Sequence, residues 1–168
     1  MLNSKKSQSS IIDLLNAVIV FFSVFIIIIL LFNFYSSRLQ KDMLREELKD
    51  KTFMLSDILL SNGIPADWNS ENVELIGLSI YDKHITKKRL DELSKISYMD
   101  AKNIMGLKGF DFYIRLIEPD GNLLREYGSE DEAKEIVALR RIVFYENSPA
   151  QLEVKVWRKL PEQSKTKT

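Results

Sequence analysis

The stretch SQSSIIDLLNAVIVFFSVFIIIILLF, at residues 7–32, decides the fold class of this chain. From residue 14 to residue 37 there is no charged side chain, a run of 24 residues. As an α-helix, such a run is about 36 Å long at about 1.5 Å per residue, and the hydrocarbon core of a bilayer is about 30 Å thick. Helices in the core of a small domain are seldom apolar on every side. We therefore predict a transmembrane helix over residues 11–37.

We expect this apolar run to be an anchor that is retained. Removable secretory signals have an apolar region of roughly 7–15 residues and a cleavage site with small residues, and neither feature is present here. The charges beside the run do not settle its orientation. Lys5 and Lys6 precede it, but more basic residues follow it: Arg38, Lys41, Arg45, Lys49 and Lys51. By the positive-inside rule alone, these flanks favour a cytosolic C-terminal part.

The segment after the anchor predicts a second stretch of helix. Between residues 36 and 63, apolar side chains recur at helical spacing from Leu39 and Met43 to Leu59. Asn62, Gly63 and the following proline end the pattern. We interpret this stripe as a packing face for the chain's own domain. Pairing with a second chain is the alternative, because the spacing lasts for barely three heptads.

The rest of the chain predicts a small antiparallel sheet with two short helices inserted. Thr86 and Ser97 are candidate caps of these helices, and the second opens with a capping-box pattern, SYMD. Alternating or apolar runs predict strands at residues 73–81, 110–118, 123–128, 135–145 and 152–157. PDGN at 119–122 and ENSPA at 146–150 are the expected turns. A helix on one face of such a sheet is an α+β fold, with Trp68 and Trp157 as core anchors.

Composition argues against several classes of function. The 24 basic and 24 acidic residues balance, so no basic surface for nucleic acid is predicted. There is no cysteine, and His84 is the only histidine, which removes thiolate and multi-histidine metal sites. Catalytic and nucleotide-binding motifs are missing. Arg140 and Arg141 are candidates for facing an anion, although at least one is expected on a solvated strand face. We predict no enzyme, cofactor or metal.

The N-terminal residues Lys5, Lys6, Gln8 and Ser10, followed by SSIIDLL with Asp13, carry a likeness to a known family. They resemble the start of archaeal type IV pilin-like precursors with a class III signal peptide, in which a prepilin peptidase cuts just before a hydrophobic helix that is kept. The resemblance implies cleavage between Ser7 and Gln8, although the family mostly has glycine where Ser7 stands. Weaker likeness extends to four later stretches: residues 62–69, 73–79, 111–116 and 152–157.

This resemblance implies a pilin-like α+β fold and a domain plan. Residues 1–10 would be a cytoplasmic leader, 11–37 the transmembrane helix, 38–160 an extracytoplasmic domain, and 161–168 a disordered tail without apolar residues. Besides membrane lipid, the implied partners are prepilin peptidase and other pilin-like subunits.

Asp13 has two interpretations. A carboxylate near the membrane interior is costly unless it is paired, and in a pilin-like assembly it can pair with the freed α-amine of a neighbouring subunit. Alternatively, Ser10 and Asp13 form a capping box in the first turn of the helix, where the helix dipole favours an acid.

Three functions follow from these patterns. The chain is expected to be a pilin-like subunit or minor pilin. The first alternative is an uncleaved single-pass protein with an extracytoplasmic binding domain, and the second is an inverted protein with a cytosolic interaction domain.

Overall fold

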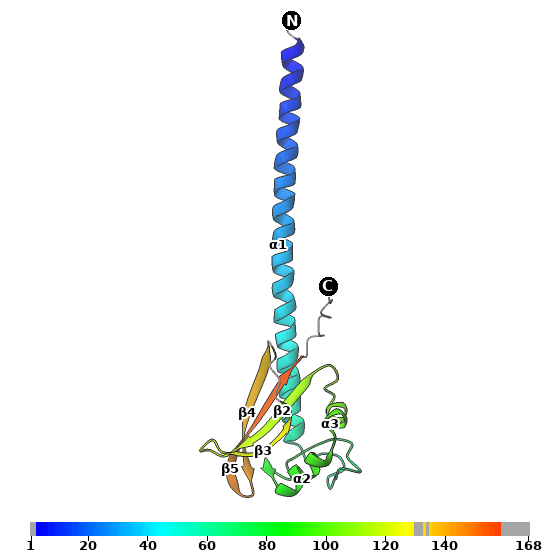
Figure 1. The fold of residues 1–168 in the computed structure, drawn as a ribbon, viewed down its shortest axis with the longest axis vertical. Coiled ribbons are helices and arrows are strands. Elements are labelled where there is room, and N and C mark those ends of the chain that lie inside the picture. Colours follow the sequence, from blue (N-terminus) through cyan, green and yellow to red (C-terminus); the bar gives the residue numbers. More distant parts are fainter. Residues whose placement is uncertain (1–2, 130–132, 134, 159–168) are drawn as a thin grey trace, which may run out of the picture. The chain divides into compact units, whose positions relative to one another are not determined.

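The computed structural model describes residues 3–129, 133 and 135–158, with side chains from Asp13 onward. These residues form a long helix, two short helices and a five-stranded mixed sheet, so the chain is α+β (Figure 1). In chain order the elements are α1 (Asn3–Leu59), β1 (His84–Ile85), α2 (Lys87–Lys95), α3 (Tyr98–Ile104), β2 (Asp111–Ile117), β3 (Leu123–Gly128), β4 (Ile136–Tyr145) and β5 (Ser148–Trp157). The predicted disordered tail, 161–168, lies outside the described residues.

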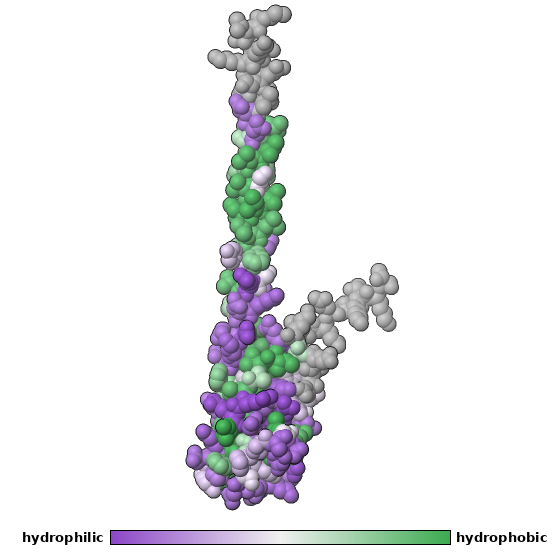
Figure 2. Space-filling view, turned by 90° about the vertical axis from the view of Figure 1, so that its left-hand side faces the viewer, coloured by the Kyte–Doolittle hydropathy of each residue, from purple (hydrophilic) through white to green (hydrophobic). Residues whose placement is uncertain are grey.

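The chain divides into two compact units, residues 1–44 and 45–168, and α1 runs through both. In the first unit, the described apolar side chains of α1 from Leu14 to Met43 are exposed, and Figure 2 shows a hydrophobic band on the helix. Length and composition make this helix able to cross a membrane, as predicted, and an N-terminal signal sequence shares that property. Leu39 and Met43, predicted on the packing stripe, are exposed in this unit.

In the second unit, the end of α1 packs on one face of the sheet. The buried side chains of α1 form one stripe at helical spacing: Leu48, Thr52, Leu55, Ser56 and Leu59. Arg141 of β4 donates to Ser56 Oγ at 3.2 Å, so the sheet face that carries Arg141 is turned toward the helix. In the central strands, the same face holds buried apolar side chains: Phe112, Ile114, Leu116, Ala150, Leu152, Val154 and Val156. The stripe on α1 is therefore used within the chain from Leu48 onward.

The sheet has the strand order β1-β4-β5-β2-β3. Three of its pairings are antiparallel, as predicted, and they join β4, β5, β2 and β3. The fourth is parallel and short, because β1 pairs with β4 only at His84↔Phe144 and Ile85↔Tyr145.

The prediction of a strand at residues 73–81 is wrong. This segment makes only isolated bridges, Ile64↔Leu75 and Ser79↔Ile85. Its backbone binds the end of α1 instead, where Leu78 N–H donates to Leu59 O at 2.8 Å. Gly77 lies so close to this turn that an added Cβ would stand 2.2 Å from the nitrogen of Gly63. The apolar alternation reflects burial against the helix end, not a place in the sheet.

The short helices begin where they were predicted, but only one cap is the predicted one. Ser97 Oγ accepts a hydrogen bond from Asp100 N–H at 3.2 Å, which confirms Ser97 as the cap of α3, and the Asp100 carboxylate accepts from the Ser97 hydroxyl at 2.6 Å. Thr86 is the N-cap residue of α2, yet its side chain makes no cap bond. Glu146 replaces it, because its Oε1 accepts from Lys87 N–H at 2.7 Å.

The β4–β5 hairpin turns more tightly than predicted. Only Glu146 and Asn147 form the loop, with φ of 46° and 68°, while residues 148–150 already belong to β5. Positive φ at both central residues is the geometry of the two-residue turns that match the twist of hairpin strands. The predicted PDGN turn is confirmed, since Gly121 N–H donates to Glu118 O at 3.0 Å.

Candidate functional site

The first candidate site is the start of the apolar helix. The helical backbone begins at Asn3, so Ser10 and Asp13 lie inside α1 and Ser10 is not the N-cap residue of the unprocessed chain. The side chains of Ser7, Gln8 and Ser10 lie outside the described residues. Asp13 is described, and its side chain is exposed.

Between residues 13 and 32, the polar side chains lie on one side of this helix. At 3.6 residues per turn, Asn16 and Ser23 fall within about a quarter turn of Asp13. Ser23 Oγ donates to Ile19 O at 2.8 Å, so its hydroxyl is satisfied within the helix. Phe21 and Phe25 lie on the other flank of Asp13, about 80° and about 120° around the helix from it. Their rings stack on each other with centroids 6.3 Å apart. Polar side chains on one side of an apolar helix are typical of helix–helix contacts in membranes.

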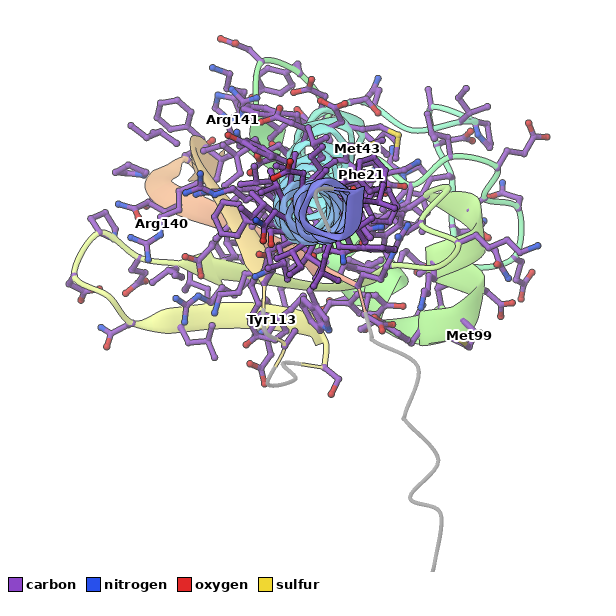
Figure 3. The ribbon with its side chains drawn as sticks, turned by 90° about the horizontal axis from the view of Figure 1, so that it is seen from above. Phe21, Met43, Met99, Tyr113, Arg140 and Arg141 are labelled. Carbon is purple, nitrogen blue, oxygen red and sulfur yellow. The ribbon has the colours of Figure 1, made fainter. Side chains whose placement is uncertain are left out.

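The second candidate site is a row of charges across the sheet face that is turned away from α1. Arg140 and Arg141 are consecutive on β4 and leave opposite faces of the sheet (Figure 3). Arg141 pairs with Asp57 of α1, whereas Arg140 Nε donates to Glu153 Oε1 at 2.6 Å. Arg115 donates to the other oxygen of Glu153, whose side chain is only 3% exposed.

This row continues to the last strand of the sheet. Glu126 of β3 lies opposite Arg115 and accepts a hydrogen bond from the hydroxyl of Tyr113. Across β4, β5, β2 and β3 the row is therefore Arg140, Glu153, Arg115 and Glu126, with alternating charge. Burial raises the pKa of Glu153, but hydrogen bonds from its two arginines outweigh this effect and hold the pKa below its ordinary value. The anion predicted for this arginine pair is thus supplied by the chain's own carboxylates.

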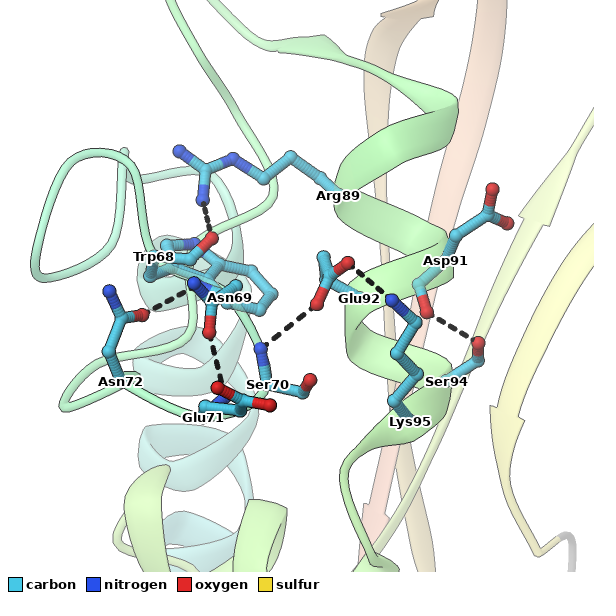
Figure 4. A network of polar contacts seen from close by, with 10 residues as sticks. All are labelled: Trp68, Asn69, Ser70, Glu71, Asn72, Arg89, Asp91, Glu92, Ser94 and Lys95. Atoms are coloured by element: carbon cyan, nitrogen blue, oxygen red, sulfur yellow. Dashed lines mark hydrogen bonds and ion pairs between the residues drawn. The ribbon is translucent and has the colours of Figure 1, made fainter.

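A third cluster of polar contacts attaches the loop after α1 to α2 (Figure 4). Trp68 is buried, and its indole Nε1 donates to Gly77 O at 2.8 Å. Ser70 N–H donates to Glu92 Oε2 at 3.0 Å. The Lys95 ammonium, hydrogen-bonded to the same carboxylate, holds the pKa of Glu92 down to about 2. These contacts are internal to the chain, so we interpret this cluster as structural.

His84 was predicted in a polar loop and instead stacks between two aromatic rings. The Tyr81 ring lies 4.5 Å from it and the Phe144 ring 4.9 Å, measured between centroids. Tyr81 and Phe144 are exposed, so the stack forms an apolar patch beside β1.

Two open hollows occur on the second unit. One, of about 420 Å³, lies between the β2–β3 and β4–β5 turns, and the other, of about 360 Å³, lies beside α3. Within the described part of the chain, no three acidic or histidine side chains are placed to hold a metal ion.

Sequence reasoning missed the charged row and the Trp68 cluster, because both join residues that are far apart in the chain. The only local signal was the alternation of charged and apolar residues in β5 and β2. No known protein family matches this chain, and neither a curated protein nor a solved structure is significantly similar to it.

Proposed function

We propose that this chain is a membrane-anchored, non-enzymatic pilin-like subunit, or minor pilin, of an archaeal type IV pilus-like filament. Its partners would be membrane lipid, a prepilin peptidase and other pilin-like subunits, with the α+β domain outside the cytoplasm. The observation that carries the proposal is the side of α1 with Asp13, Asn16 and Ser23, in a stretch whose other residues from 14 to 32 are all apolar and exposed.

This arrangement suits packing between equivalent helices. Cleavage after Ser7 would make Gln8 the first residue, and Asp13 would then lie one to two turns from the new α-amine. The amine of an axially shifted neighbour can meet the Asp13 carboxylate, and pairing is what makes a carboxylate tolerable in a span. Such a contact is heterologous and leads to an open filament.

The non-enzymatic part of the proposal is supported by how the described polar side chains are used. Glu153, Arg140, Arg141 and Glu92 all pair with other groups of the chain. In the hollow beside α3, the Ser97 hydroxyl donates to the Asp100 carboxylate at 2.6 Å, but the same hydroxyl oxygen accepts from Asp100 N–H as the cap of α3.

A second candidate is an uncleaved single-pass protein whose domain binds a partner. The exposed stack of Tyr81, His84 and Phe144 favours it, because contact surfaces between proteins are enriched in aromatic side chains. The basic flank after the span favours the inverted form, with a cytosolic domain. Protease protection of the domain in intact cells separates the inverted form from the other two.

The deciding measurement is the intact mass of the chain from its native membrane. The pilin-like function predicts a mature chain that starts at Gln8. A mass that includes residues 1–7 would contradict it and leave the anchored binding protein.

A second measurement follows assembly. Asp13→Ala should insert into the membrane as well as the wild type, or better, and should be depleted from sedimentable filaments. Ser23→Ala is the matched control on the same side of the helix, and it should assemble normally because its hydroxyl is already satisfied by Ile19. Normal assembly of Asp13→Ala would exclude the proposed pairing.

A further inference from the structure

The sheet has two open edges. Beyond the short β1, the outer edge of β4 from Ile136 to Val143 has no strand beside it within the described part of the chain, and the same holds for the outer edge of β3. Open edges present unpaired backbone N–H and C=O groups and are templates for pairing with another chain. The open part of β4 has eight residues and β3 has six, so β3 can pair with most of it.

The charged row identifies which backbone groups point outward. Phe144 N–H donates to Lys83 O, so even-numbered residues of β4, including Arg140, direct their backbone groups away from β5. In antiparallel pairs, opposite residues exchange both hydrogen bonds or none. Arg140 and Glu153 therefore exchange none, Glu153 and Arg115 exchange both, and Arg115 and Glu126 exchange none. Glu126 thus also directs its backbone groups outward.

Arg140 and Glu126 are therefore the two ends of one row. They lie on the same face, at opposite edges, with opposite charges and outward backbone groups. The strands that carry them run in opposite directions, because three antiparallel pairings separate β4 from β3. A second copy in the same orientation can place its β4 antiparallel to β3 of the first, with Arg140 opposite Glu126 as a fully hydrogen-bonded pair.

We infer that copies of this chain associate edge to edge, β3 of one against β4 of the next, with Glu126 opposite Arg140. This register also places Leu124 opposite Ile142 and Gly128 opposite Ala138. Ile142 is 73% exposed, more than any other large apolar side chain described in the second unit, and this pairing would cover it. The contact is heterologous, so it continues from copy to copy as a row.

The same register has one unfavourable pair, Arg125 opposite Arg141 on the other face. The alternative pairing of β4 with a second β4 is worse, because it gathers Arg140 and Arg141 of both copies at one edge. Pairing of β3 with a second β3 likewise brings two Glu126 side chains together. Charge therefore favours the β3–β4 contact over both symmetric ones. This association does not depend on N-terminal processing and goes beyond the proposed function.

The test uses the full chain in lipid vesicles and disulfide cross-linking, for which the absence of native cysteine is an advantage. Opposite residues of a hydrogen-bonded antiparallel pair have Cα atoms about 5.5 Å apart, within the range of a disulfide. A mixture of Leu124→Cys chains and Ile142→Cys chains should give linked dimers under mild oxidation. The double variant should give a ladder of larger species.

The control mixture pairs Ile142→Cys with Met99→Cys, an exposed position on α3 away from both edges. Cross-linking of the Leu124→Cys mixture no greater than in this control would overturn the inference. Dimers formed by Ile142→Cys alone would also overturn it, in favour of β4–β4 pairing. Buried tryptophan fluorescence reports that each variant is folded.

Two neighbouring substitutions on the Leu124→Cys chain should act with opposite sign. Glu126→Gln should lower the cross-linking yield by a factor of about two to five, and Arg125→Gln should raise it by a similar factor, as expected for cross-strand charge pairs. A change in thiol reactivity alone would have the opposite signs. Loss of the Glu126 carboxylate favours the reactive thiolate and would raise the yield, whereas loss of the Arg125 charge would lower it. Equal yields in both variants would show that the register is wrong.

Discussion

The guanidinium of Arg89 lies over the ring of Trp68, 4.9 Å from its centroid, and Nη1 donates to the carbonyl oxygen of the same residue at 3.0 Å. A second donor of Arg89 binds Ala66 O. Arg89 thereby fixes the irregular loop after α1 to helix α2 through both the ring and the backbone. Burial lowers the pKa of Arg89, but the side chain stays charged because an arginine titrates so far above neutral pH.

Arg89→Ala should lower the free energy of unfolding by about 2–4 kcal/mol, because it leaves two carbonyl groups without their donors. Urea unfolding followed by tryptophan fluorescence measures the change. Lys88→Ala, at an exposed neighbouring position, should change stability by no more than about 0.5 kcal/mol. A similar small effect of Arg89→Ala would mean that water replaces the guanidinium without loss.

Trp157→Ala should cost about 3–5 kcal/mol, the usual range for removing a large buried aromatic side chain. Trp157 is only 1% exposed, at the end of β5. The urea midpoint is again the measurement, with Met99→Ala as an exposed control. An unchanged midpoint for Trp157→Ala would show that the ring is a surface contact and not part of the core.

Stability should fall in acid, in part through Glu153. Its pKa is lower in the folded chain than the ordinary value of 4.5, so the unfolded chain binds a proton first as the pH falls. The stabilisation is complete above about pH 4.5 and is lost as the pH falls through the lower, folded pKa. Glu153→Gln should flatten the profile of unfolding free energy between pH 2 and 6, and an unchanged profile would contradict this role of Glu153.

Gly77→Ala should destabilise the chain by about 3 kcal/mol, at the upper end of the overpacking range. Its Cβ would lie 2.2 Å from Gly63 N and 2.4 Å from Ser61 O, and both are backbone atoms. Gly106→Ala is the contrast, because its Cβ would meet nothing within 4 Å and only the φ of 67° is strained. That change should cost about 1–2 kcal/mol. Equal losses in thermal unfolding would contradict the close packing at Gly77.

A chain that starts at residue 38 should fold without the apolar part of α1. Residues 45–168 form a compact unit, and the buried residues of α1 begin at Leu48. Circular dichroism should show mixed helix and strand, and sedimentation should show a monomer at low concentration, where an edge contact is weak. A chain that starts at residue 60 lacks the buried stripe of α1 and should not fold. Aggregation of the first chain but not of the full protein would contradict intramolecular packing by α1.

Features that depend only on neighbouring residues could be predicted from the sequence. The apolar run of α1, the Ser97 cap of α3 and the PDGN turn each follow from a few consecutive residues, and each occurs where predicted. The β4–β5 hairpin also follows from two β-rich runs, although positive φ at Glu146 and Asn147 makes its loop shorter than the residue types suggested.

Other features depend on contacts between distant parts of the chain, and the local sequence pattern could not predict them. Alternating apolar residues at 73–81 fit a buried segment equally well in a sheet or against a helix end. The hydrogen bond to the Leu59 carbonyl at the end of α1 and the close packing of Gly77 favour the second. The same holds for charge. Arg140 pairs with Glu153 and Arg141 with Asp57, although the two arginines are adjacent in sequence. The local sequence could not predict these partners, because strand pairing places Glu153 beside Arg140 and helix packing places Asp57 beside Arg141. The sequence by itself therefore determined the long apolar helix and the class of fold, and the tertiary structure determined which charges are buried, which are paired and which sheet edges stay open.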